Sequence, residues 1–163
     1  PAVGVVSFKL SDVLSKDNLW TDYVKGVVSE IIKLGHKLDK GFNAYIIGNL
    51  PNGASLSSSA SLELLFCEII REIHSLELSD LDLVKISQGA ENNFVGLHCG
   101  IMDQFAIGMS KKDHAILLDC ATVSYDYAPL DLKDNVILIL NTNTLSPFLV
   151  STSLSLTYKE TSF

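Results

Sequence analysis

The chain has 163 residues, of which 47% are hydrophobic and 19% charged, and its formal net charge is −7. A chain of this length can bury a core, and its composition is typical of a folded domain. The negative charge argues against a nucleic-acid surface, and no apolar run reaches the roughly 18 to 20 residues that span a bilayer. We therefore expect neither nucleic acid nor a membrane as a partner.

The N-terminal third of the chain contains one helical and one strand-like pattern. Helical spacing predicts a helix over about 19–34, with Asp17 or Asn18 as its cap and Gly35 at its end. Residues 42–49, "FNAYIIGN", are rich in β-branched and aromatic side chains and predict a strand.

Three helical segments are predicted after the stretch "LPNGASLSSSAS" at 50–61. The first begins within the serine run and shows an apolar face comprising Leu62, Leu65, Phe66, Ile69, Ile70 and Ile73. Ser79 and Asp82 resemble a capping box that opens a second helix ending near Gly96. "GIMDQFAIGMS", at 100–110, predicts a third, shorter helix.

Strands are predicted to follow the helices. "HAILLDC" at 114–120 and "SYDYAPL" at 124–130 predict paired strands, and "NVILILNT" at 135–142 predicts a buried one. The order of these elements indicates a layered α/β or α+β fold. The serine- and threonine-rich end of the chain shows no sustained period.

The cysteines indicate the compartment. Cys67, Cys99 and Cys120 are widely spaced and form no C-x-x-C pair, so the sequence supports neither a disulfide framework nor a zinc site. The first residues also lack the basic and apolar regions of a signal peptide. We expect reduced thiols in a cytoplasmic protein.

The serine stretch at 50–61 has two interpretations. A helix N-terminus exposes unpaired N–H groups and the positive end of the helix dipole, which bind anions, and serine hydroxyls could add donors or ligands for Mg²⁺. Alternatively, a serine caps the helix and Pro-Asn-Gly is a simple turn. The stretch fits neither the P-loop pattern nor G-x-S-x-G.

Two carboxylates stand in the otherwise apolar stretch "GAENNFVGLHCGIMDQF" at 89–105. Glu91 could be a surface charge and Asp103 a helix cap. Together with the serines, however, they provide what a Mg-nucleotide site needs, namely oxygen ligands for a hard cation and a base for an attacking hydroxyl.

These motifs resemble those of a known family. "GNLPNGASLSSSASLELL" resembles the phosphate-binding signature of the GHMP small-molecule kinases, specifically the galactokinases, and "AENNFVGLHCGIMDQFAIGMSKKDHAILLDC" resembles their catalytic-aspartate segment. "WTDYVKG" resembles the run upstream of their phosphate loop. The resemblance covers about residues 16–143. It implies an α+β fold like the GHMP-kinase N-terminal domain (ribosomal protein S5 domain 2-like), a mixed sheet with helices on one face, here incomplete.

The resemblance also implies the activity and the site residues. The activity is transfer of the γ-phosphoryl group of ATP to the C1 hydroxyl of galactose, with ATP and Mg²⁺ required. Asp103 matches the catalytic aspartate that contacts the sugar hydroxyl, and Cys99 and Gly100 lie where the family chain approaches the sugar. Glu91 matches the metal ligand, and either Ser58 or Ser59 completes the metal site. The phosphate loop and the weaker adenine-pocket match comprise Gly53, Ala54, Ser55, Leu56, Ser57, Ser58, Ser59 and Trp20.

The sequence departs from the family pattern in three places. The family's N-terminal sugar-binding segment with its arginine has no counterpart, and Arg71, the only arginine, lies on the exposed side of a helix by periodicity. Ser55 stands where the family usually has glycine, which would be strained at positive φ. After the partial GHMP domain at 1–143, the Ser/Thr/Leu-rich tail at 144–163 matches nothing in that family.

These departures define the functional expectation. We expect a fragment of a galactokinase with weak or no activity, and the alternative is a non-catalytic nucleotide- or sugar-binding relative that acts as a sensor or regulator. A chain lacking parts of the family domain would also expose apolar surface, so self-association is expected.

Overall fold

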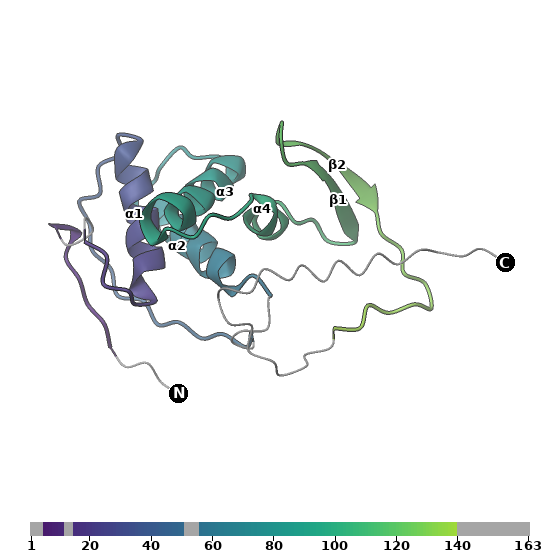
Figure 1. Cartoon of the computed structure of the whole chain (residues 1–163), viewed down its shortest axis with the longest axis horizontal. Helices are drawn as coiled ribbons and strands as arrows, with labels where there is room; N and C mark the ends of the chain where they lie inside the picture. Colours follow the sequence, from purple (N-terminus) through teal and green to yellow (C-terminus); the bar gives the residue numbers. More distant parts are fainter. Residues whose placement is uncertain (1–4, 12–14, 51–55, 140–163) are drawn as a thin grey trace.

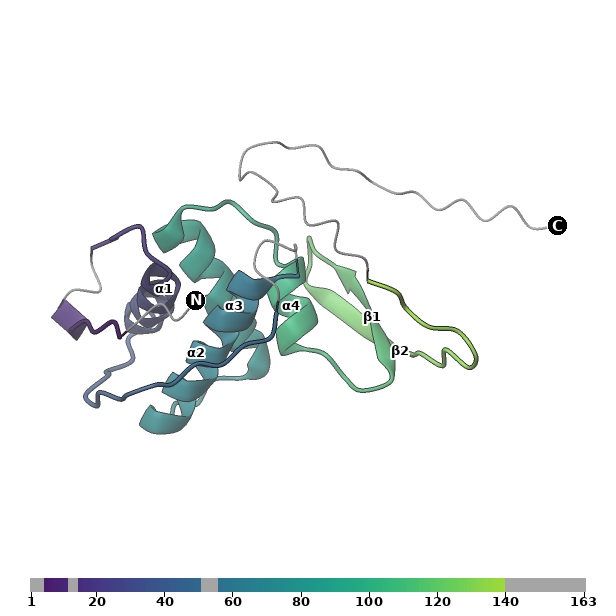
Figure 2. The same cartoon turned by 90° about the horizontal axis from the view of Figure 1, so that it is seen from below.

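The structure, a computed structural model, describes residues 5–11, 15–50 and 56–139. Along the chain it contains α1 (Thr21–Lys33), α2 (Ser58–His74), α3 (Asp80–Gly89), the π-helix η2 (Ala90–Val95), α4 (Met102–Gly108), β1 (His114–Asp119) and β2 (Ser124–Pro129). The helices form one group, and the β1–β2 hairpin lies beside α4 (Figure 1; Figure 2). The α+β fold class is therefore confirmed. No helix in the described ranges is both long and apolar enough to cross a membrane.

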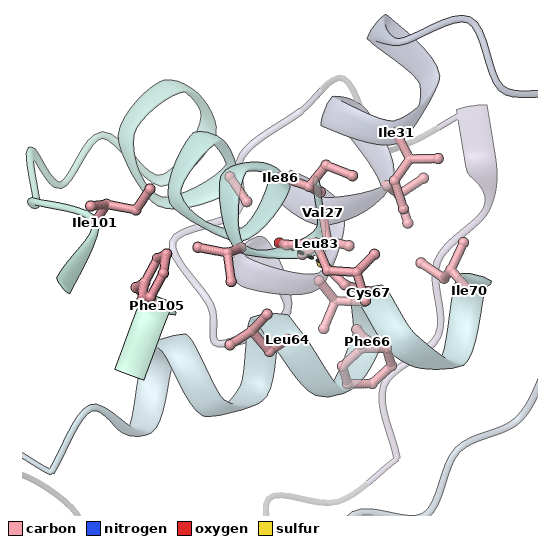
Figure 3. Packing of buried hydrophobic residues seen from close by; sticks show 14 residues of the cluster. Val27, Ile31, Leu64, Phe66, Cys67, Ile70, Leu83, Ile86, Ile101 and Phe105 are labelled. Carbon is pink, nitrogen blue, oxygen red and sulfur yellow. Dashed lines mark hydrogen bonds between the residues drawn. The ribbon is translucent and has the colours of Figure 1, made fainter. Parts of the chain in front are cut away.

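The core lies between the helices, as Figure 3 shows. It is formed by apolar side chains from all five helical segments: Val24, Val27, Val28, Ile31, Leu64, Phe66, Cys67, Ile70, Leu83, Val84, Ile86, Ala90, Ile101 and Phe105. Complete burial of a side chain such as Ile31 or Phe105 contributes about 1.5–3 kcal/mol. This packing fixes how α2, η2 and α4 are placed relative to one another.

Helix α1 confirms the predicted segment but not its predicted start. Trp20 occupies the N-cap position and makes no side-chain capping hydrogen bond. The side chains of Asp17 and Asn18 do not cap the helix; instead their backbone N–H groups donate to the carboxylate of Asp22, at 3.0 and 2.7 Å. Gly35 follows the C-cap at φ 92°, a conformation that glycine adopts without strain, as predicted.

The buried face of α2 differs from the predicted apolar face. Leu65 is 45% exposed, whereas Leu64 and Cys67 are in the core. Glu63, three residues after Ala60 and four before Cys67, is on this same buried face. Helix α2 has more apolar residues than its buried face can hold. The contacts with α3 and α4 determine which of them are buried.

The next two helices agree with the sequence pattern. Ser79 accepts a hydrogen bond from the N–H of Asp82, whose side chain accepts one from the N–H of Ser79, so the predicted capping box is confirmed. Helix α3 continues directly into η2, which ends at Gly96 with φ 83°. The last part of the helix predicted to end near Gly96 is thus π-helical, and π-helical turns are often found at functional sites.

The predicted hairpin is confirmed. Strands β1 and β2 pair antiparallel, with His114 opposite Pro129 and Asp119 opposite Ser124. The hairpin contacts α4 through Tyr125, whose ring packs edge-on against Phe105 at a centroid distance of 5.0 Å.

The strand predicted at 42–49 does not form, and neither does the described part of the one predicted at 135–142, of which residues 140–142 lie outside the described residues. Residues 42–49 and 135–139 contain no strand, and the only sheet within the described residues is two-stranded. Both segments are largely exposed, with Ile47 at 80% and Val136 at 84%. The prediction relied on β propensity, which reflects packing between strands rather than a preference of the isolated backbone.

Helix α1 and η2 approach each other closely at Gly26. A Cβ atom on residue 26 would lie 3.0 Å from the Cβ of Ala90 and 3.1 Å from its carbonyl oxygen. Glycine therefore favours this close spacing, and the same contact helps to position Glu91, the next residue along η2.

We predict that Gly26→Leu destabilises the chain by about 1–3 kcal/mol, because the added side chain would force α1 away from η2. Urea denaturation followed by circular dichroism measures this loss. Gly41→Leu is the matched control, because a Cβ at residue 41 meets no atom within 4 Å. Equal effects of the two substitutions would contradict the role assigned to the contact.

Candidate functional site

The start of α2 leaves its serine hydroxyls unused for capping. Ser57 is the N-cap residue, adopts the left-handed conformation with φ 54° and ψ 38°, and makes no side-chain capping hydrogen bond. The alternative interpretation, in which a serine of this run caps the helix with its side chain, is therefore wrong at the N-cap position. Helix α3 uses the Ser79 capping box, so the two helix starts differ in kind.

Part of the predicted phosphate loop lies outside the described residues, namely Gly53, Ala54 and Ser55. Of the others, Leu56, Ser57 and Ser59 are half-buried and Ser58 is exposed. Strain at positive φ was expected at Ser55; within the described part of this loop it occurs at Ser57. Helix α2 has 17 residues, so its N-terminus carries a substantial dipole and unpaired N–H groups.

Glu91 is not the surface charge that one interpretation proposed, because only 7% of its area is exposed. Its Oε2 atom accepts a hydrogen bond from Gln104 Nε2 at 2.7 Å and one from Cys99 Sγ at 3.5 Å. A buried carboxylate held by one oxygen in this way needs a partner or a task.

Asp103 lies in the first turn of α4 and is exposed. The N-cap position belongs to Ile101, so the alternative interpretation of Asp103 as a helix cap is wrong. Asp103 and the buried Gln104 are consecutive, and they point to opposite environments: one carboxylate faces solvent and one carboxamide faces the core.

The segment before α4 is held by hydrogen bonds from α3 and η2. The backbone N–H of Cys99 donates to Asn92 Oδ1 at 2.8 Å, and its carbonyl oxygen accepts from Asn92 Nδ2 and Gln88 Nε2, each at 3.3 Å. Gly100 follows, exposed and with open space around it. Burial, and next the charge of Glu91, raise the pKa of the Cys99 thiol to about 11, so Cys99 serves as a hydrogen-bond donor and not as a thiolate nucleophile.

Glu63 is a site residue that the sequence reasoning missed. It is completely buried on α2, and its Oε2 accepts a hydrogen bond from Ser87 Oγ at 2.9 Å, while Oε1 has no partner among the described residues. Burial, followed by the charge of Glu91, raises the pKa of Glu63 to about 8. The sequence feature that could have indicated its burial is its helical spacing, three residues after Ala60 and four before Cys67.

Trp20 lies at the start of α1, in a turn held by buried charges. Its ring packs against the core, and its Nε1 is buried with no partner among the described residues. Lys25, only 2% exposed, pairs with Asp17 and also donates to the carbonyl oxygen of Ser15 at 3.2 Å. This ion pair fixes the turn that presents Trp20.

Hydrogen bonds join one group of the predicted residues and do not include the serines. Glu91 and Cys99 meet Gln104, next to Asp103, whereas the side chains of Ser57, Ser58 and Ser59 bond to no other described residue. Within the described ranges, no three His, Cys, Asp or Glu residues form a metal-binding cluster. A metal here would need hydroxyl, phosphate or water oxygens besides Glu91.

Arg71 cannot supply the site with a positive charge. Its guanidinium pairs with Glu68 at 2.6 Å and Asp80 at 2.8 Å, and it also donates to the carbonyl oxygen of Leu78. It lies 13 residues after Ser58 on α2, roughly 20 Å along the helix axis.

The comparisons with known proteins agree on one family. The model of the "GHMP kinases N terminal domain" matches residues 22–111. The chain is 55% identical over 145 residues to a galactokinase of Lactiplantibacillus plantarum, covering 88% of this chain and 37% of that protein. It is 50% identical over 143 residues to a galactokinase of Clostridium perfringens, covering 87% and 37%. The chain thus spans about 37% of the length of these curated relatives.

A solved structure is also similar. The galactokinase of Lactococcus lactis complexed with galactose matches with a TM-score of 0.79 and 43% identity, over 82% of this chain and 35% of that one.

The raised pKa of Glu63 predicts that the chain loses stability as pH rises. The folded state retains the Glu63 proton up to a pKa of about 8, whereas the unfolded carboxyl releases it near 4.3. The contribution is complete below the unfolded pKa and is lost between about pH 4.3 and 8, by no more than about 5 kcal/mol. Glu63→Gln should flatten this dependence, as measured by urea denaturation at pH 5 and pH 8.

The control is Glu72→Gln, which changes an exposed glutamate on the same helix and should leave the wild-type pH dependence intact. An unchanged slope in Glu63→Gln would show that Glu63 titrates normally.

Proposed function

This chain belongs to the GHMP kinase family, and on that premise we propose that it forms the phosphate-binding and catalytic-aspartate part of a galactokinase. The reaction is transfer of the γ-phosphoryl group of ATP to the C1 hydroxyl of galactose. The observation that carries this proposal is the likeness to galactokinases, at 43 to 55% identity, over more than four fifths of the chain. We further propose that the kinase part is residues 1–143 and that 144–163 form a divergent tail.

We assign the residue roles from the resemblance to the family motifs. Asp103, exposed at the start of α4, orients the C1 hydroxyl of the sugar and accepts its proton on a carboxylate oxygen. Cys99 and Gly100 lie just before it, where the sugar would approach. In this proposal the N–H groups at the start of α2 hold the phosphates, and Trp20 lines the adenine pocket.

The donor atoms fit Mg²⁺. The cation prefers oxygen ligands and binds through one or two carboxylates together with phosphate oxygens, and Glu91 with Ser58 or Ser59 offers a carboxylate and a hydroxyl of that kind. Ser58 and Ser59 open α2, and Glu91 is held in place by Gln104. When bound, Mg²⁺ neutralises charge on the β- and γ-phosphates.

We predict that the 163-residue chain binds Mg·ATP but phosphorylates galactose far more slowly than the roughly 1–100 s⁻¹ of typical kinases, because it spans 37% of its relatives. Asp103→Asn should retain nucleotide binding and lower residual turnover at least ~100-fold, the usual contribution of a general base. Calorimetry with Mg·ATP and a coupled assay with galactose measure both. Asp126→Asn, at an exposed aspartate on β2, is the control.

The outcomes separate the alternatives. Turnover at ordinary kinase rates would refute the expectation of weak activity. Residual turnover that survives Asp103→Asn would refute the role of that carboxylate. Nucleotide binding with no detectable turnover in the wild type would favour the sensor or regulator alternative.

Self-association is a separate proposal about the same chain. Residues 42–50 and 136–139 expose large apolar side chains, Tyr45 at 90% and Leu138 at 74% among them, and their backbones pair with no strand in the described part. Unpaired strand-forming segments of this kind associate with other chains.

We predict a mass above that of the monomer in light scattering at micromolar concentrations, with a second copy of the chain as the partner. Ile137→Lys should lower that mass by placing a charge in the exposed apolar segment. A monomeric wild type would contradict the proposal.

A further inference from the structure

Gln104 is a completely buried polar side chain that directly contacts the proposed metal ligand. Its Nε2 donates to Glu91 Oε2 at 2.7 Å, which is shorter than the contacts that either side chain makes with Cys99 Sγ. Gln104 Nε2 also lies 3.6 Å from Cys99 Sγ. Helix α4 is thereby linked to η2 through one carboxamide.

The same carboxamide lies beside a second buried acid. Its proximity to Glu63 opposes the effect of burial on the pKa of that carboxyl, so the Gln104 amide is between acids from α2 and η2. Burial of the Tyr23 phenol on α1, followed by the charges of Glu91 and Glu63, raises the pKa of Tyr23, which shows that α1 also borders this group.

Packing alone does not account for an amide at this position. Gln104 Oε1 is buried and has no partner among the described residues, which is a cost that an apolar side chain of similar volume would avoid. The feature that an apolar side chain could not replace is the N–H donated to Glu91.

We propose that Gln104 is a positioning residue for the metal site: it holds the Glu91 carboxylate by Oε2, which leaves Oε1 as the oxygen offered to Mg²⁺. This inference rests on the proposed function, because it assumes that Glu91 ligates the cation of Mg·ATP. Both hydrogen bonds to Glu91 from described side chains end on Oε2. Fixing one oxygen of a flexible glutamate orients the other, and removal of such an outer partner typically costs 10–100-fold in metal affinity.

The position of Gln104 in the sequence adds a second consequence. It follows Asp103 directly on α4, so the first turn of this helix carries both the proposed proton acceptor and the group that orients the metal ligand. One rigid element would therefore position both the residue that orients the metal ligand and the residue that accepts the hydroxyl proton, as catalysis by orientation requires.

The test compares ATP affinity with and without Mg²⁺ by calorimetry, in the 163-residue chain. The ratio of the two dissociation constants is the gain from the cation. Gln104→Leu, which retains the approximate volume but removes the donor, should lower this gain about 10-fold or more and leave the affinity for metal-free ATP unchanged.

Ser87→Ala is the matched control. Ser87 is equally buried and bonds the neighbouring acid Glu63, not Glu91. It should lower the thermal midpoint while leaving the Mg²⁺ gain at its wild-type value. A Gln104→Leu chain with the wild-type gain would overturn the inference, as would an equal loss of gain in Ser87→Ala, because the effect would then be only structural.

A measurement on the wild type decides the matter if Gln104→Leu does not fold. In ¹⁵N-labelled chain carrying ATP, addition of Mg²⁺ should shift the side-chain amide resonances of Gln104, because the cation withdraws charge from the carboxylate that they bond. Unshifted resonances would overturn the inference even where Mg²⁺ tightens ATP binding. A wild type that binds no ATP under either condition would instead overturn the proposed function, and the inference with it.

Discussion

The contact between α1 and η2 at Gly26 and Ala90 is the constraint on which the site depends. The two helices approach so closely that a methyl group on residue 26 would lie only 3.0 Å from the Cβ of Ala90, tighter than most Cβ contacts. Glu91, next to Ala90, is consequently buried beside the core and faces Gln104 instead of solvent. A looser approach would expose this carboxylate and release it from its donor, so a backbone contact in the core controls the electrostatics of the site.

Much of the fold could be predicted from sequence because local chemistry determines it. The Ser79–Asp82 capping box and Gly35 are sequence signals with a direct structural cause, and helical or strand periodicity places α1, α2, α3 and the β1–β2 hairpin where they are found. The strand predicted at 42–49, and the described part (135–139) of the strand predicted at 135–142, are absent for a complementary reason. Their apolar content indicates a tendency to pair, but a strand also needs a neighbour that local sequence does not supply.

The candidate site divides in the same way. Glu91 and Asp103 could be selected because carboxylates in an apolar stretch are conspicuous, yet their environments could not: one is buried and the other exposed. Glu63 and Gln104 were missed because a single polar residue on a helix resembles a solvated one until the neighbouring helices are in place. Only the tertiary packing of α2, η2 and α4 shows that both are completely buried.

The pairing of Arg71 has a consequence for how a nucleotide would be recognised. The one guanidinium in the chain, with its planar fork suited to phosphate, is committed to Glu68 and Asp80 and fastens α2 to the start of α3. In the proposed function, a triphosphate at the other end of α2 would be bound by backbone N–H groups and a divalent cation, and not by the Arg71 guanidinium. Affinity would then depend on the direction of N–H bonds and on ion coordination. Binding of this kind would select ligands by shape. Added monovalent salt would weaken it less than it would weaken binding to a cluster of exposed basic side chains.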